Sequence, residues 1–146
     1  MNFVLVETRE ELLPHLLELC PGFRRAFGRE LRLWRGETAM GTYADLALFA
    51  HFLVDTYESG SVEAFPGVFH FVEQSLGREE ADLSEQLVWG LLEDLWSQAG
   101  LRLADPDVFL VWLGPRSQRA YEEVSRGWRA RPQLMELLRA ERRHPA

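Results

Sequence analysis

The segment from Asp82 to Ala99 most constrains the fold, because it predicts a helix that neighbouring elements must cover on most sides. At about 100° per residue, its apolar side chains occupy more than half of the circumference: Leu83, Leu87, Val88, Leu91, Leu92, Leu95, Trp96 and Ala99. The remaining strip holds Gln86, Gly90, Glu93, Asp94 and Ser97. We expect this helix to be central, with Gly100 ending it at the C′ position.

Capping residues, prolines and glycines predict the other helices. Thr8 and Glu11 have the spacing of a capping box, and Gly114-Pro115 is a typical helix start. The predicted helices run from Thr8 to about Cys20, from Pro21 to about Arg35, from Tyr43 to about Glu58, from Val62 or Pro66 to Leu76 and from Pro115 to Trp128, with a short element after Asp105.

These elements predict a single all-α domain over residues 1–146, a bundle of six to eight helices around the Asp82–Ala99 helix. Residues 130–146 form a basic tail, either loosely ordered or a last frayed helix from Pro132 to about Arg143. An alternative stays open, because residues 3–6 and 108–113 are short and rich in strand-favouring residues. They could pair as a two-stranded β ribbon in a mainly α fold.

Charge is distributed unevenly along the chain. Residues 38–114 hold two arginines and thirteen acidic residues, a net charge of −11, whereas residues 115–146 carry +4. All sixteen cations are arginine, which we attribute to coding bias. An acidic middle segment favours a basic partner, or a homodimer in which it meets the other copy's basic tail.

Composition bears on the compartment. No stretch approaches the roughly 18 apolar residues of a membrane-spanning helix. The apolar run near Met1 is shorter than a secretory signal needs, and Cys20 is the single cysteine, so no disulfide framework is expected. We expect a cytoplasmic protein that does not associate with membranes.

Four residues resemble a bundle metal site. His51 and Asp55 are four residues apart on one predicted helix, and His70 and Glu73 three apart on the next. The helical wheels turn both pairs away from the apolar faces, so we expect no metal and no cofactor. A helical metal-binding protein or metal-dependent enzyme built on these four residues is the alternative hypothesis.

Nucleophilic catalysis and nucleic-acid binding have less support in the sequence. The chain lacks a Gly-x-Ser-x-Gly elbow, and Cys20 lies among leucines as a structural thiol does. Arg25, Arg29 and Arg32 share one helix side, but Glu30 dilutes their charge and the acidic middle segment would repel a duplex. We therefore expect neither catalysis nor nucleic-acid binding.

The stretch Leu113-Gly-Pro-Arg-Ser117 could hold an anion at a helix start or simply join two packed elements. Gly114 at N-cap and Pro115 at N1 are ordinary helix-start residues. Ser117 falls on the packed side of the helix, where a small hydroxyl can bond local backbone and allow close approach. We interpret the stretch as a structural turn.

The segments WGLLEDLWSQAG, residues 89–100, and WLGPRSQRAYEEVSRGW, residues 112–128, resemble an uncharacterised family of small all-helical bacterial proteins. The shared features are a Gly-x-Leu-Glu helix, here Gly90 to Glu93, and a Leu-Gly-Pro-x-Ser turn, here Leu113 to Ser117. The resemblance covers about the C-terminal half of the chain. It implies a helical fold and an association with toxin and immunity systems, and it implies no catalytic residues.

The expected function is therefore non-enzymatic: an interaction module whose acidic surface binds another protein, in the concrete version an immunity-type inhibitor of a basic toxin. Trp89 would anchor the partner. The expected partner-binding residues are Asp55, Glu58, Glu63, Glu79, Glu80, Trp89, Glu93 and Asp94, and Asp45 would add to the acidic surface.

Overall fold

The fold is all-α, as the sequence predicts. The computed structural model describes residues 9–33, 42–78 and 81–129. Its elements are α1 (Arg9–Leu19), α2 (Phe23–Leu33), α3 (Thr42–Glu58), α4 (Phe65–Leu76), α5 (Ala81–Gln86), the π-helical η1 (Leu87–Leu92), α6 (Glu93–Arg102), the 3₁₀ turn η2 (Leu110–Trp112) and α7 (Pro115–Arg129). No helix in these ranges is long and apolar enough to cross a bilayer.

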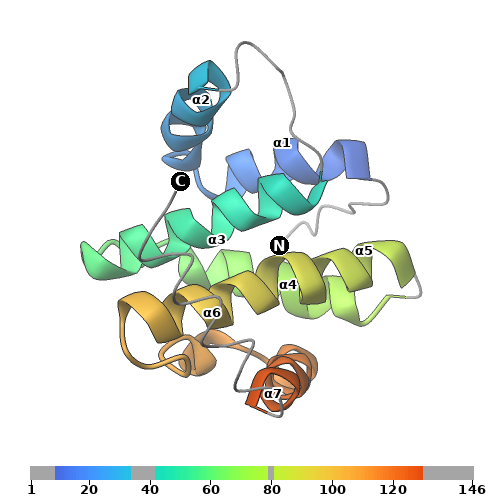
Figure 1. Ribbon diagram of the computed structural model, residues 1–146. Helices are drawn as coiled ribbons and strands as arrows, with labels where there is room; N and C mark the ends of the chain where they lie inside the picture. The colour runs from blue at the N-terminus through green and yellow to red at the C-terminus, as the bar shows by residue number, and fades with distance from the viewer. Residues whose placement is uncertain (1–8, 34–41, 79–80, 130–146) are drawn as a thin grey trace.

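One long helical segment lies at the centre, again as predicted. Elements α5, η1 and α6 run on without a break from Ala81 to Arg102, since the junction residues Gln86, Leu92 and Glu93 all have α conformation. We call this segment the central helix. Figure 1 shows α3 on one side of it and α7 on the other, and both helices contact η1 and α6.

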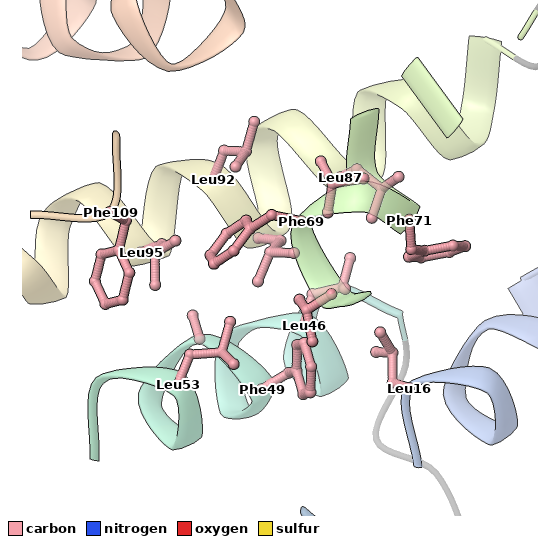
Figure 2. Packing of buried hydrophobic residues seen from close by; sticks show 14 of the residues in the cluster. Leu16, Leu46, Phe49, Leu53, Phe69, Phe71, Leu87, Leu92, Leu95 and Phe109 are labelled. Atoms are coloured by element: carbon pink, nitrogen blue, oxygen red, sulfur yellow. The ribbon is translucent and has the colours of Figure 1, made fainter. Parts of the chain in front are cut away.

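The core gathers side chains from every described helix. In Figure 2, Phe69 of α4 lies between the central helix and α3. Leu16 of α1 and Phe109 of the loop before η2 lie at opposite ends of the group of apolar side chains around Phe69. All three side chains are essentially inaccessible to solvent, and burial of such residues supplies most of the driving force for folding.

The end of the central helix differs from the prediction. Gly100 does not end it, because α6 continues to Arg102 and the Leu103 N–H donates to the Ala99 carbonyl at 2.9 Å. The positive φ angle, +59°, falls on Ala104 instead. The additional turn is stabilised by Arg102, whose guanidinium binds both Asp55 and Glu58 at the end of α3.

The β-ribbon alternative is wrong for residues 108–113, which form turns and η2. The physical reason is the placement of the rings. Phe109 and Trp112, three residues apart, both pack on Phe65, with centroid distances of 5.8 and 4.9 Å. A strand would point residues with this spacing to opposite faces, whereas a helical turn points them the same way. The other half of the proposed ribbon, residues 3–6, lies outside the described residues.

The N-terminal helices form close to the predicted bounds. Pro14 lies inside α1 and is exposed, and Cys20 is buried at its end as expected. Helix α2 begins at Phe23, two residues later than predicted, since Pro21-Gly22 form a turn in which Phe23 N–H donates to the Cys20 carbonyl at 2.9 Å. Thr8, the predicted N-cap, and the segment beyond Pro132 lie outside the described residues.

Candidate functional site

The central helix contains a π-helical turn from Leu87 to Leu92, which the sequence pattern did not predict. The Glu93 N–H donates to the Val88 carbonyl, five residues back instead of the usual four. Such turns are rare in α-helices and are frequent at functional sites. The turn therefore makes this part of the helix a candidate functional site.

Gly90 brings α3 against this turn. A Cβ atom at position 90 would lie 2.9 Å from Leu46 Cδ1 and 3.2 Å from Tyr43 Cδ1, so a larger residue would require the Leu46 side chain or one of the two helices to shift. The polar strip around Gly90 is therefore partly covered. Gln86 and Ser97 are buried, and α3 packs along both η1 and α6.

Two large aromatic side chains remain exposed at this contact. The side chain of Trp89, the residue before Gly90, is 50% exposed. The side chain of Tyr43, which lies against Gly90, is 53% exposed. Exposed rings beside polar residues are typical of protein-binding surfaces. Trp89 was predicted as an anchor, whereas Tyr43 was missed because only the packing of α3 brings it here.

Carboxylates flank Trp89 along the helix. Glu85 lies four residues before it and Glu93 four residues after it, which places all three near one side. Asp94 adjoins Glu93, and both are half-buried. We call Tyr43, Glu85, Trp89, Glu93 and Asp94 the tryptophan face.

The electrostatics of Glu93 are unfavourable to its charge. Burial is the main effect that raises the pKa of Glu93, and the neighbouring charge of Asp94 raises it further. A hydrogen bond with the Trp128 side chain of α7 acts in the opposite direction. Carboxylates held under such conditions are more common at functional sites than elsewhere.

The remaining predicted partner-binding residues that the structure describes do not join this face. Asp55 and Glu58 bind Arg102 at the far end of α3, twelve residues or more from Tyr43, which is about 18 Å along a helix. Glu63 is exposed in the connection between α3 and α4. Asp45 is buried in the first turn of α3, and Glu79 and Glu80 lie outside the described residues.

The four metal-site candidates are also dispersed. Asp55 binds Arg102, Glu73 binds the start of α7, and His70 is exposed, while His51 is half-buried on α3. Within residues 9–33, 42–78 and 81–129, no three His, Cys, Asp or Glu side chains are grouped so that they could hold a metal ion.

Glu73 instead caps a helix in another part of the chain. Its carboxylate accepts the backbone N–H groups of Arg116 at 3.1 Å and Ser117 at 2.9 Å, and the Ser117 hydroxyl at 2.8 Å. These hydrogen bonds satisfy donors that a helix N-terminus leaves open. Burial alone would raise the pKa of Glu73, but the bonds from Ser117 and Arg116 together lower it.

The structural interpretation of the Leu-Gly-Pro-Arg-Ser turn fits this geometry. Ser117 is fully buried, and its Oγ accepts the Gly114 N–H at 3.0 Å, which is one half of a capping box. Gly114 has no side chain to supply the other half, and Glu73 supplies it from α4. A Cβ at position 114 would lie 2.7 Å from the Glu73 carboxyl group, so glycine is what admits the carboxylate.

The contact is reciprocal. The Arg116 guanidinium lies over the C-terminal end of α4, where it approaches the Glu73 carbonyl at 3.4 Å and the Glu73 carboxylate at 3.8 Å. A cation at this end of a helix is favoured by the helix dipole. A Cβ on Gly77 would lie 2.4 Å from the same guanidinium. Each helix thus stabilises the terminus of the other.

Comparison with known proteins gives a family and no relative of known activity. A family model described as Domain of unknown function (DUF7674) matches residues 13–129, which include the tryptophan face and the Glu73–Ser117 cap. No curated protein and no solved structure matches the chain significantly.

Proposed function

The chain belongs to the DUF7674 family of domains of unknown function, and from the geometry of the tryptophan face we propose that it is a non-enzymatic module that binds a basic protein. The observation that carries the proposal is Trp89, half-exposed on a π-helical turn between two carboxylates. Tryptophan is among the residues that contribute most to binding energy when a partner covers them.

Charge supports a basic partner. The tryptophan face contains three acidic residues and no basic one, and it belongs to the segment 38–114 whose net charge is −11. Opposite charge on a partner would speed encounter and select against acidic proteins. Burial of Trp89 and Tyr43 would then slow dissociation, which is where most differences in affinity arise.

In its concrete form the proposal is an immunity-type inhibitor, which covers the basic surface of a toxin in the cytoplasm. This form rests on the resemblance of the segments 89–100 and 112–128 to small bacterial proteins. A homodimer, in which the acidic segment of one copy meets the basic tail of the other, is the competing form. Light scattering across a salt series separates the two, since only the homodimer changes mass without a partner.

Photo-cross-linking tests the proposal. A photoreactive amino acid at position 89 should capture a discrete basic protein in cells, whereas the same group at Val111, a residue 78% exposed on η2, should not. The captured protein is then purified and its affinity measured at low and high salt. We expect the affinity to fall with salt, and Trp89→Ala to weaken binding by about tenfold or more, the effect of losing a hot-spot residue.

Val111→Ala is the matched control and should leave the affinity unchanged. Circular dichroism of both variants shows whether each keeps its helices. An acidic captured protein, binding that does not respond to salt, or equal effects of the two alanine variants would each contradict the proposal.

A further inference from the structure

A second feature of the surface is a cleft of about 420 Å³ between α7 and the loop that precedes it. Asp107 lines it from the loop and Leu110 from the start of η2, and Tyr121, Glu122, Ser125 and Arg126 line it from α7. None of these residues belongs to the tryptophan face. The volume lies within the range of pockets that hold a small molecule or a single side chain.

The two walls of the cleft are fixed to each other. The Tyr121 hydroxyl donates a hydrogen bond to the Pro106 carbonyl, and the Tyr121 ring is buried. The loop is braced internally, because Asp105 Oδ1 accepts the Asp107 N–H at 3.0 Å and the Asp107 carbonyl accepts the Leu110 N–H at 3.1 Å. A preformed cleft of this kind loses little entropy when it binds.

Ser125 adds a hydroxyl group to the lining of the cleft. The residue is 9% exposed and lies on the α7 wall. A hydroxyl group both donates and accepts hydrogen bonds, so a ligand atom in the cleft can bond to it.

Negative charge predominates around the opening. The carboxylates of Asp107 and Glu122 come from opposite walls, against the single guanidinium of Arg126. The environment of the Tyr121 phenol agrees with this balance. Burial is the main effect that raises its pKa, and the charges of Asp107 and Asp105 raise it further. The cleft therefore favours a cationic occupant over an anionic one.

We infer that this cleft receives an arginine side chain from the basic protein partner. The inference rests on the proposed function and names the side chain that the partner inserts. An arginine matches the lining in each part: Leu110 and the Tyr121 ring can cover its aliphatic stem, and a guanidinium can donate to carboxylates on both walls. A lysine ammonium is a point charge and would engage the opposed carboxylates less completely.

The test uses acetyl-arginine amide as the probe and its neutral isostere acetyl-citrulline amide as the control ligand. Titration of the full ¹⁵N-labelled chain, followed by NMR, should shift the amide signals of Leu110, Glu122 and Ser125 with the arginine probe. The citrulline probe should shift them far less. Equal responses to the two ligands would overturn the inference.

Matched variants on α7 sharpen the test. Glu122→Gln and Ser125→Ala should each weaken binding of the probe by about two- to fivefold, the effect of losing one solvent-accessible charge-assisted contact. Glu123→Gln removes the neighbouring exposed carboxylate, which does not line the cleft, and should leave the affinity unchanged. A weakening as large in Glu123→Gln would show that the probe responds only to overall charge.

The two proposals can fail separately. Probe signals that move around Trp89 and leave the cleft unchanged would exclude the arginine site, while the tryptophan face could still bind its partner. Conversely, loss of partner binding in Glu122→Gln with no effect of Trp89→Ala would retain the cleft and reject the tryptophan face as the anchor.

Discussion

The Glu73 carboxylate of α4 accepts the backbone N–H of Ser117 in α7 at 2.9 Å, across 44 residues of sequence. It occupies the place of the side chain that Gly114 lacks. Because Arg116 in turn lies over the end of α4, the two helix termini are stabilised by the same small group of residues.

Glu73→Gln should destabilise the protein by about 1–3 kcal/mol, the range for losing a helix cap and hydrogen bonds to a charged acceptor. The side-chain nitrogen of glutamine is itself a hydrogen-bond donor, so it would face backbone N–H groups that now donate to the Glu73 carboxylate. Urea denaturation at neutral pH measures the change. Glu63→Gln, at an exposed carboxylate in a connection, is the control and should change the free energy of unfolding by far less.

The stabilities of the wild type and of Glu73→Gln should become equal in acid. The pKa of Glu73 is lowered in the folded state, so its stabilisation is fully present above the ordinary value of 4.5 and is lost as pH falls through the folded value. The difference in melting temperature between wild type and Glu73→Gln should therefore shrink below pH 4.5. A difference that stays constant down to strongly acidic pH would contradict the cap.

Two glycines of the central helix should respond oppositely to alanine. Gly90→Ala should destabilise by about 1–3 kcal/mol, since the added methyl overpacks the contact with Leu46 and Tyr43. Gly100→Ala meets only the Pro106 side chain at 3.8 Å, an ordinary contact, and should stabilise by about 0.5–1 kcal/mol through helix propensity. Denaturation of both variants decides it, and effects of the same sign would refute the close approach of α3.

His15 should make stability fall in mild acid. Its ring packs 4.6 Å from Phe71, and burial lowers its pKa despite the opposing charge of Glu18. Stability is then fully present above the ordinary value of 6.5 and is lost as pH falls through the lowered folded value. His15→Phe should flatten this part of the melting profile. His70→Phe, at an exposed position, should leave the profile as it is.

Glu93 should show the reverse dependence. Its folded pKa is raised by burial and by Asp94, so the stability that its protonated form contributes is present below 4.5 and is lost as pH rises through the folded value. Glu93→Gln should therefore melt at a higher temperature than wild type at neutral pH, by a margin that disappears near pH 4. Glu85→Gln, an exposed neighbour, should show no such margin.

The fold followed from local patterns wherever those patterns reflect packing directly. The apolar circumference of residues 82–99 predicted a central helix, and Gly114-Pro115 predicted the start of α7. Gly100 misled for an instructive reason. A glycine ends a helix only when no contact of the following residues stabilises a further turn. Here Arg102, just beyond Gly100, binds Asp55 and Glu58 and so stabilises that turn.

The candidate site was predictable only in part, for the same reason. Trp89, Glu93 and Asp94 share one helix, so their proximity could be deduced from spacing. Glu85 could have been added by the same four-residue rule. Tyr43 reaches the face through a tertiary contact that no local pattern contains. The role of Glu73 was predictable in principle, because Gly114 at the N-cap leaves the amides of α7 in need of an outside acceptor.

The π-helical turn also fixes how the two halves of the central helix are phased. A turn with five-residue hydrogen bonds is equivalent to an α-helix carrying one inserted residue, so everything before Leu87 is rotated by about 100° relative to an uninterrupted helix. If the same residues formed a regular α-helix, Leu83 would swing off the interior that it now fills. Deleting a single residue such as Val88 would instead remove the π-helical turn and leave Leu83 facing that interior, so the core depends on the π-helical turn because the helix contains one extra residue.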